Sequence, residues 1–361
     1  MMSFDEASTR LLLNAYKGLL RPILFTQDPE KIHDFIIHAL GILPEPILNL
    51  AATVIGTPDQ GVEVAGVTFP GRVGFGAGLD KNGDAAGAWA SLGFGFMELG
   101  TVTAHAQPGN PKPRSFRLVR SNGLINRMGF NNAGAEALAA QLVQRGQLRG
   151  NNALGCPVGI SIGKTKVTPL DQALPDYLFS LEALEPHADY LAVNVSSPNT
   201  PDLRKLQGRD QLAELTAELV HRTVELTPTN PVPIFLKVAP DLSLGQLEEV
   251  IEVCEATGVS GLIATNTTVG REFIHPADMH IAEQVGGLSG SPLRSKAVEM
   301  VENITSRTDL PVMGVGGIMS PNDAQAMFDA GAVLVQIFTG FIFNGPALVR
   351  GINKLTTPRV F

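Results

Sequence analysis

The sequence of 361 residues has few of the features that mark disulfide-rich, metal-binding or nucleic-acid-binding proteins. Its only cysteines, Cys156 and Cys254, lie far apart and outside any metal-binding motif, so we expect inert core thiols in a reducing compartment. His275 and His280 lack the spacing of two ligands on one helix face, and no metal site is predicted. The net charge of −8 argues against a basic surface for nucleic acid.

Long hydrophobic runs are also missing. No run approaches the roughly 18 apolar residues of a spanning helix, and Asp5 and Glu6 interrupt a signal-peptide pattern, so we expect neither a spanning helix nor export. Two amphipathic helices are predicted instead, one over residues 11–23 and one that begins with Asp28-Pro29-Glu30. Such helices can cap the main domain or lie at a lipid surface, and both roles can hold together.

The rest of the chain has the composition of a large globular domain, with 44% hydrophobic and 17% charged residues. Pro44, Pro46 and a polar stretch at residues 56–60 separate it from the N-terminal helices. We therefore divide the chain into a helical segment over residues 1–50 and a main domain over residues 51–361.

Short apolar segments alternate with helical segments along the main domain. Eight such strands are the number expected for a (β/α)₈ barrel, and they are predicted at residues 73–78, 96–102, 158–163, 190–196, 234–239, 261–266, 312–317 and 334–339. A doubly wound sheet is the alternative. Its dinucleotide fingerprint fails because Leu79 stands where the third glycine is required.

Polar residues follow these strands, at the end where barrel enzymes keep their active sites. The fourth strand opens into Asn194-Val195-Ser196-Ser197-Pro198-Asn199-Thr200, the densest polar cluster of the set. Each strand-end residue alone could be a helix cap or a turn residue. Lys237 differs, because a lysine inside an apolar strand is costly to bury unless an anion or a carbonyl meets it.

Glycines gather after the last three strands, at residues 286–290 and 314–317 and at Gly340. Glycine serves any tight turn, but barrels also use open backbone N–H groups at these places to bind phosphate. In combination with Lys237, a phosphorylated cofactor explains the pattern better than turns alone.

These motifs resemble the dihydroorotate dehydrogenase family. The matching stretches occur in the family's order at residues 76–83, 100–103, 126–132, 194–200, 264–268 and 286–290. The resemblance is closest to the bacterial, quinone-reducing class 2 enzymes, because the helical extension is present and Ser197 stands where soluble class 1 enzymes have cysteine. It implies a monomer bound peripherally to the cytoplasmic face of the cell membrane.

The resemblance implies oxidation of dihydroorotate to orotate, in the biosynthesis of UMP, with FMN as cofactor and a quinone as acceptor. Ser197 is then the general base at C5, assisted by Thr200 or by a water, and a hydride passes from C6 to N5 of FMN. Lys81 meets the substrate carboxylate, and asparagine amides read the pyrimidine edge. The implied substrate residues are Lys81, Asn126, Arg127, Met128, Gly129, Phe130, Asn194, Asn199, Asn266 and Thr267.

Lys237 is expected to stabilise negative charge on the flavin. The implied FMN residues are Ala77, Gly78, Leu79, Asp80, Lys81, Thr101, Ser161, Asn194, Lys237, Thr265, Gly290, Gly317, Phe338 and Thr339. His33 and Arg117 are the quinone-site candidates. Two positions depart from the family pattern: Ser161 replaces a usual asparagine, and Phe338 replaces a tyrosine that many class 2 enzymes have.

Other functions share part of this pattern. Another FMN barrel acting on a dihydropyrimidine would keep the phosphate and lysine positions, but it has no need of Ser197 and the asparagines. A soluble dihydroorotate dehydrogenase with a different acceptor, a phosphate-binding barrel without redox chemistry and a non-catalytic binding module are further alternatives. A yellow purified protein would exclude the phosphate-binding barrel, and reduction of a dye by dihydroorotate would exclude the binding module.

Overall fold

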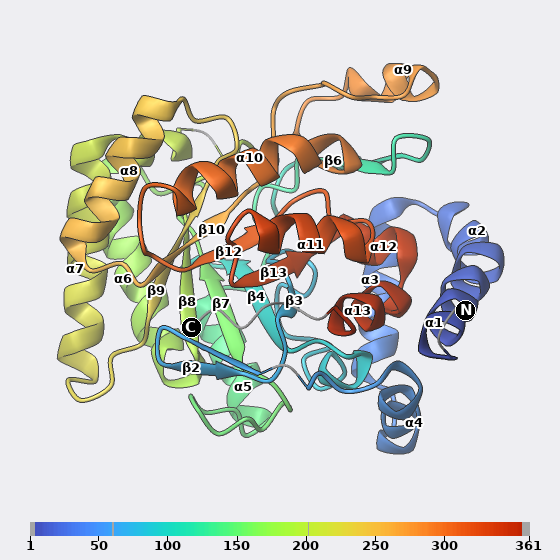
Figure 1. Ribbon diagram of the computed structural model, residues 1–361. Helices are drawn as coiled ribbons and strands as arrows, with labels where there is room; N and C mark the ends of the chain where they lie inside the picture. The colour runs from blue at the N-terminus through green and yellow to red at the C-terminus, as the bar shows by residue number, and fades with distance from the viewer. Residues whose placement is uncertain (1–3, 60, 201, 356–361) are drawn as a thin grey trace.

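A closed parallel barrel forms the centre of the computed structural model, which describes residues 4–59, 61–200 and 202–355 (Figure 1). Its eight strands pair in chain order, and the last pairs with the first. They are β3 (Val73–Phe75), β4 (Phe96–Val102), β7 (Val158–Ile162), β8 (Tyr190–Asn194), β9 (Ile234–Val238), β10 (Gly261–Ala264), β12 (Val312–Val315) and β13 (Leu334–Ile337). The predicted barrel and all eight of its strands are confirmed.

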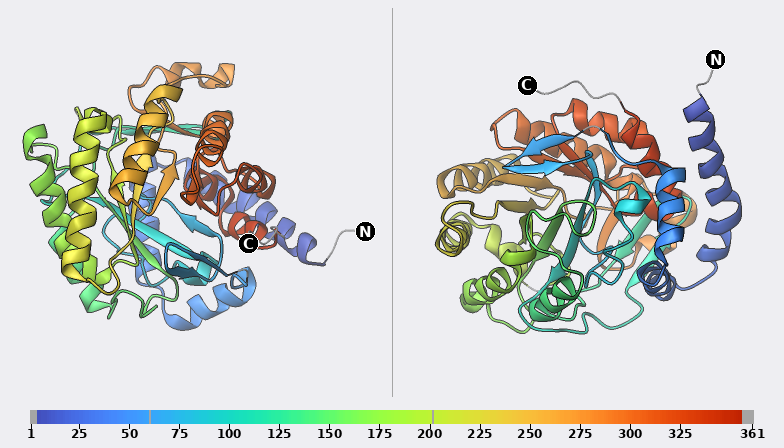
Figure 2. Two further views of the ribbon diagram at one scale, coloured as in Figure 1. Left: turned by 60° about the vertical axis from the view of Figure 1, so that its left-hand side comes forward. Right: turned by 90° about the horizontal axis from the view of Figure 1, so that it is seen from below.

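Helices cover the outside of the barrel between successive strands (Figures 1 and 2). They are α5 (Ala135–Gln144), α6 (Ala173–Leu184), α7 (Arg209–Leu226), α8 (Leu244–Thr257), α10 (Arg294–Thr305) and α11 (Pro321–Asp329), with α12 (Thr339–Asn344) and α13 (Pro346–Asn353) after the last strand. Apolar residues recur along their inner faces, such as Leu212, Leu215 and Leu219 of α7, and bury against the strands. This packing fixes where the strand ends point.

The bottom of the barrel is closed by a hairpin of β1 (Val62–Val64) and β2 (Val67–Phe69). Its Phe69 is fully buried, and its ring meets that of Phe96 edge to face with a centroid distance of 5.2 Å. Tyr190 and Phe235 complete this aromatic layer.

Glycines in the strands make room for these aromatic rings. A Cβ atom added to Gly74 would lie 2.5 Å from the ring of Phe96, and one added to Gly159 would lie 2.0 Å from that of Tyr190. A Cβ atom added to Gly261 would lie 2.4 Å from the ring of Phe235. The aromatic rings therefore fill space that the neighbouring strands leave empty.

Two insertions build a second sheet beside the mouth of the barrel. Its strands are β5 (Ser115–Leu118), β6 (Gly123–Asn126) and β11 (Gly287–Gly290), in the order β11-β6-β5. We predicted open backbone at residues 286–290. The structure corrects this, because residues 287–290 pair antiparallel with β6. The short helix α9 (Met279–Ala282) belongs to the insertion that carries β11, and it projects away from the barrel (Figure 1).

The N-terminal helices stand at one side of the barrel (Figure 2). The first amphipathic segment forms α1 (Phe4–Ala15), a π-helical stretch η1 (Tyr16–Leu20) and α2 (Arg21–Phe25), and α1 packs on α13. The second forms α3 (Pro29–Gly41), and the Asp28 carboxylate caps it by accepting from the backbone N–H groups of Glu30 and Lys31, both at 3.0 Å.

A further helix, α4 (Glu45–Ile55), was not predicted, because Pro44 and Pro46 were taken to end the helical region. Proline is compatible with the first turn of a helix, since the N–H groups there have no intrahelical partner. The segment boundary that we placed at residue 50 falls inside this helix. Among the described residues no single helix is long and apolar enough to cross a membrane; α3 and α4 pass that test only together, and they are bent by 106°.

Replacing Phe69 by alanine should test whether the hairpin stabilises the barrel. Loss of this buried ring should lower the free energy of unfolding by about 3–5 kcal/mol, as large-to-small changes in cores do. Chemical denaturation would measure the change. The matched control is Phe273→Ala, because the ring of Phe273 is 76% exposed. Equal effects of the two substitutions would contradict the structural role of the hairpin.

Candidate functional site

A cavity of about 480 Å³ opens at the carboxyl ends of the barrel strands and continues between the barrel and the N-terminal helices. The barrel and its loops supply most of the polar lining residues, such as Asn194 and Lys237, and the helices supply mainly apolar ones such as Leu24, Ile36 and Leu40. One cavity therefore joins a polar end to an apolar end. Its size suits a small ligand or cofactor.

Most of the predicted site residues line this cavity. They are Ala77, Gly78, Leu79, Lys81, Thr101, Asn126, Met128, Gly129, Phe130, Asn194, Ser197, Asn199, Lys237, Thr265, Asn266, Thr267, Gly290, Gly317, Phe338 and Thr339, together with His33 and Arg117 at the helical end. Residues from every part of the main domain thus meet at one place.

Three predicted residues lie outside the cavity lining. Asp80 accepts from the Trp89 indole at 2.9 Å and from two backbone N–H groups, and it organises the turn after β3. Arg127 extends its side chain to Gln284, Val285 and Pro113. Ser161 is fully buried with its hydroxyl 2.9 Å from that of Thr101, which does line the cavity. Sequence alone could not tell these supporting positions from their neighbours.

The asparagines form a connected set. The Asn194 amide donates to Thr101 Oγ1 at 3.0 Å, and the Asn266 amide donates to Asn194 Oδ1 at 3.3 Å. Asn199 donates to Asn126 Oδ1, also at 3.3 Å, so an insertion strand and the loop after β8 are tied together. These contacts hold the four amides, two at strand ends and two in loops, around one space.

Ser197 is nearly buried, and its Oγ accepts from the backbone N–H of Asn199 at 3.2 Å. That bond leaves the hydroxyl hydrogen free to point elsewhere, since the oxygen acts there as an acceptor. Thr200 is also buried, and its Oγ1 has no hydrogen-bond partner among the described residues. The two hydroxyl side chains belong to the same loop.

Lys237 has a partner that we did not identify from the sequence. Its ammonium group lies 3.1 Å from the carboxylate of Glu98, which is fully buried at the centre of the barrel. The same carboxylate accepts from Gln336 at 2.5 Å, from the Tyr190 hydroxyl at 3.3 Å and from the Ala77 N–H at 3.3 Å. Four donors thus stabilise its negative charge.

The signal for Glu98 was present in the sequence. It sits inside the apolar strand Phe96-Met97-Glu98-Leu99, just as Lys237 sits inside β9, and both are charged residues that need a partner. Gln336 has a similar place in β13. Pairing the two buried charges of opposite sign would have found the contact.

Burial shapes the electrostatics where the N-terminal helices meet the barrel. It lowers the pKa of His33 to about 3, with the nearby Lys81 acting in the same direction, so the imidazole is neutral at pH 7. Burial also lowers the pKa of Lys81, while the carboxylates of Asp34 and Glu30 act in the opposite direction. Lys81 and a neutral histidine therefore face the same cavity.

Arg117 and Arg114 fasten the helical end to the β5 strand and the residues before it. Arg117 donates to the backbone oxygen of Gln27 at 2.7 Å and stacks over Phe25 at 4.7 Å from the ring centroid. Arg114 forms a buried ion pair with Glu30 of α3 at 2.7 Å. The wall between the helices and the barrel is thus fixed by charge-assisted bonds.

Both cysteines are buried and free, and burial raises the pKa of each thiol to about 12. This agrees with inert core thiols. The described residues contain no group of three or more histidine, cysteine or acidic side chains that could hold a metal ion.

The sequence model of the family described as dihydroorotate dehydrogenase matches residues 60–357. The chain belongs to the dihydroorotate dehydrogenase family. It is 48% identical over 353 residues to the dihydroorotate dehydrogenase (quinone) of Chloroflexus aurantiacus, covering 94% of this chain and 95% of the relative. It is 50% identical over 345 residues to that of Salinispora arenicola, covering 93% and 97%.

A solved structure shows the same fold. The crystal structure of DHODH from Eimeria tenella in complex with ferulenol superposes with a TM-score of 0.77 at 34% identity, covering 90% of each chain. The quinone-type relatives match over nearly the whole chain. The family resemblance inferred from the sequence motifs is therefore confirmed.

Removing one member of the Glu98–Lys237 pair should destabilise the protein strongly. Glu98→Ala leaves a buried ammonium group unpaired, which costs about 3–5 kcal/mol of the free energy of unfolding. Adding Lys237→Met should recover part of that loss, because no unpaired charge then remains. Chemical denaturation of the single and double variants measures this, and losses that simply add would contradict the coupling.

Proposed function

We propose that this protein oxidises dihydroorotate to orotate with bound FMN and passes the electrons to a membrane quinone, as a step in UMP biosynthesis. The observation that carries the proposal is one cavity whose polar end gathers four asparagines, Lys81 and Ser197, and whose apolar end is walled by the N-terminal helices. The quinone-type relatives, similar over more than nine-tenths of the chain, support the same activity.

FMN fits the residues around the polar end. Gln336 lines the cavity, and its buried Oε1 has no partner among the described residues, so an N–H donor of a ligand would be met there. Gly317 has a φ of +71°, and a Cβ atom there would lie 2.3 Å from the Arg294 backbone, so a side chain is excluded from this part of the cradle. Gly290 and Thr339 would offer the phosphate further polar groups.

Bound FMN supplies a hydride acceptor at its N5 atom. The chain's own residues bind and orient the substrate beside it. Lys81 meets the carboxylate, and the side-chain amides of Asn126, Asn194, Asn199 and Asn266 read the donors and acceptors of the pyrimidine edge. Met128, Gly129 and Phe130 line the same side of the cavity.

Ser197 removes the proton from C5. A serine is a weak base at neutral pH, so a relay must carry the proton onward, either through Thr200 or through a water. The Thr200 hydroxyl is buried in the same loop and makes no hydrogen bond to Ser197 or to any other described residue. Lys237, held by Glu98, places a positive charge where negative charge grows on the flavin.

The apolar end of the cavity suits a quinone. Tyr16, Phe25 and Ile36 line it beside His33 and Arg117, which can donate to the head-group oxygens. Because His33 is neutral at pH 7, Arg117 brings the positive charge to this end. Phe338 lines the cavity between the two ends without offering a hydroxyl. We assign the N-terminal segment, predicted over residues 1–50 and continued by α4 to Ile55, to the quinone site.

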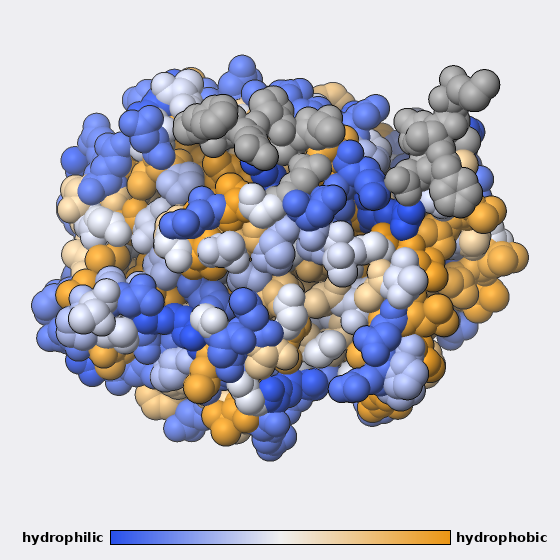
Figure 3. Space-filling view, turned by 60° about the horizontal axis from the view of Figure 1, so that its bottom comes forward, coloured by the Kyte–Doolittle hydropathy of each residue, from blue (hydrophilic) through white to orange (hydrophobic). Residues whose placement is uncertain are grey.

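The outer faces of the same helices are strongly apolar. Large hydrophobic side chains of this segment are exposed, namely Leu11, Leu19, Leu20, Ile23, Phe35, Ile42, Ile47, Leu50 and Val54. Hydrophobic surface gathers at the right of Figure 3. A patch of this extent on a monomer marks an interaction site, and insertion into the lipid interface explains how a membrane quinone reaches the cavity. We place the protein peripherally on the cytoplasmic face of the membrane.

Ser197→Ala should slow reduction of the bound flavin by dihydroorotate about 10²- to 10⁴-fold, the range that a general base contributes. Anaerobic stopped-flow absorbance measures this step. FMN content should stay unchanged, because the hydroxyl serves the proton and not the cofactor. Retention of most of the rate would refute the assignment of the base.

Leu19→Glu combined with Leu50→Glu should lower binding to phospholipid vesicles at least tenfold. Each buried leucine contributes about 1.5–3 kcal/mol, and each introduced carboxylate opposes insertion. Vesicle sedimentation measures the bound fraction. Leu148→Glu is the matched control, because Leu148 is 56% exposed but lies outside the N-terminal helices. Equal loss in both proteins would contradict a membrane-facing patch.

A further inference from the structure

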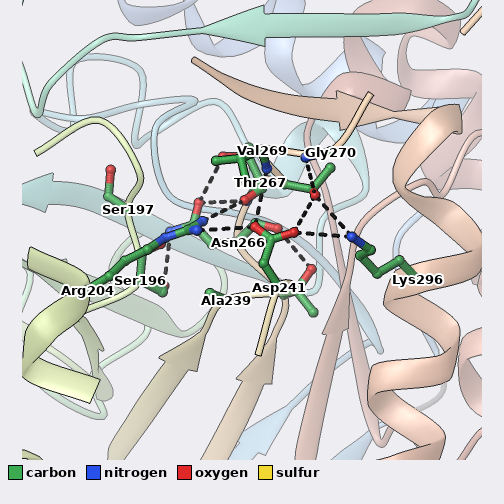
Figure 4. A network of polar contacts seen from close by, with 12 residues as sticks. Ser196, Ser197, Arg204, Ala239, Asp241, Asn266, Thr267, Val269, Gly270 and Lys296 are labelled. Atoms are coloured by element: carbon green, nitrogen blue, oxygen red, sulfur yellow. Dashed lines mark hydrogen bonds and ion pairs between the residues drawn. The ribbon is translucent and has the colours of Figure 1, made fainter. Parts of the chain in front are cut away.

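A cluster of charged side chains lies behind the catalytic loop, outside the cavity. Asp241, in the loop after β9, accepts from Arg204 at 3.2 Å and from Lys296 at 3.2 Å (Figure 4). The same carboxylate accepts from the Thr268 hydroxyl at 2.5 Å and from the Val269 N–H at 3.2 Å. Loops that follow three different strands, β8, β9 and β10, therefore meet at one carboxylate, which α10 joins through Lys296.

Arg204 is the member of this cluster that reaches the site. It lies on the short 3₁₀ helix η5 (Leu203–Gln207) in the loop after β8. Its Nε donates to the backbone oxygen of Ser196 at 3.1 Å, and its Nη2 donates to that of Thr267 at 3.4 Å. Ser196 precedes the proposed base, and Thr267 follows the substrate-binding Asn266. One guanidinium thus joins both peptide segments.

A second hydrogen-bonded contact joins the same two peptide segments. The Asn266 amide donates to Ser196 Oγ at 3.0 Å, so the two segments are also tied on the side that faces the substrate space. In Figure 4 the Ser197 side chain points away from the charged cluster, while the Arg204 guanidinium points into it. The cluster therefore acts on the backbone and leaves the Ser197 hydroxyl free.

The charge state of Asp241 supports this arrangement. Burial alone would raise the pKa of its carboxyl, but hydrogen bonds from Thr268, Val269 and Lys296 and the charge of Arg204 outweigh burial and hold the pKa below its ordinary value. The carboxylate stays ionised at neutral pH. Arg204 is consequently held in a fixed orientation by a charged partner.

We propose that Arg204 and Asp241 are positioning residues that hold Ser197 and the Asn266-Thr267 segment in register for proton removal. The inference rests on the proposed function. Neither residue lines the cavity, so neither touches the substrate. Their effect comes through geometry, where a misplacement of about 1 Å can cost roughly 10²-fold in rate.

The test compares Arg204→Gln, Arg204→Lys and Asp241→Asn in the FMN-loaded full chain. The two half-reactions are measured separately by anaerobic stopped flow, flavin reduction by dihydroorotate and flavin reoxidation by a short-chain ubiquinone. We expect Arg204→Gln and Asp241→Asn to lower the limiting rate of flavin reduction by roughly 10- to 100-fold. Reoxidation should change less than twofold. Arg204→Lys should recover part of the loss, since it keeps the charge but not the three-way donation.

The matched control is Arg209→Gln, five residues along the chain. Arg209 pairs with Glu252 at 2.6 Å, but both side chains are more than half exposed and lie away from the cavity. Its half-reactions should match those of the unaltered protein. Thermal unfolding of each variant separates loss of folding from loss of positioning.

Several outcomes would overturn the inference. Flavin reduction within twofold of the unaltered rate in Arg204→Gln would show that the contact does not position the base. Equal losses in both half-reactions would indicate a general structural role instead. Failure of dihydroorotate to reduce the unaltered protein would overturn the proposed function, and this inference with it.

Discussion

The buried contact between Glu98 and Lys237 sets the constraints on the rest of the barrel. Charges at the centre of an apolar fold require hydrogen-bond partners, and Gln336, Tyr190 and the Ala77 N–H join Lys237 in donating to the Glu98 carboxylate. Tyr190 in turn belongs to the aromatic layer that the β1–β2 hairpin closes from below. Through Tyr190, the Glu98 carboxylate therefore connects the polar residues at the base of the cavity with the aromatic layer that closes the barrel.

At the mouth of the barrel, the site is formed by strand ends and loops that are joined by hydrogen bonds and ion pairs. Amide contacts join β6, β8 and β10 on the side of the substrate, and the Asp241 cluster joins the loops after β8, β9 and β10 from behind. The α3 helix enters the same arrangement through the buried Glu30–Arg114 pair. Arg114 also donates to the backbone oxygen of Asn110. The Asn110 side-chain amide in turn donates to the backbone oxygen of Asn199. The helical segment is thus linked to the substrate loop by one ion pair and two hydrogen bonds.

The sequence allowed the barrel, its eight strands and most cavity-lining residues to be predicted, because each strand has a buried apolar core followed by polar residues. The predicted strands run up to three residues too far, for example to residue 78 where β3 ends at Phe75. After β3, β10, β12 and β13 those extra residues leave the sheet and line the cavity. The β5–β6–β11 sheet escaped prediction because its three strands come from two distant insertions and are only four residues long. Glu98 escaped because its partner lies 139 positions along the chain.

The glycines that face aromatic rings in the strands have a consequence for how this chain can change over time. At Gly74, Gly159 and Gly261, the empty side-chain position of one residue and the ring of another occupy the same volume. A larger residue in place of the glycine requires a smaller residue in place of the aromatic one. A smaller residue in place of the aromatic one leaves a void unless a larger residue replaces the glycine. Each glycine–aromatic pair can therefore change only through two compensating substitutions. The two positions of a pair should covary within the family, while single substitutions at either position stay rare.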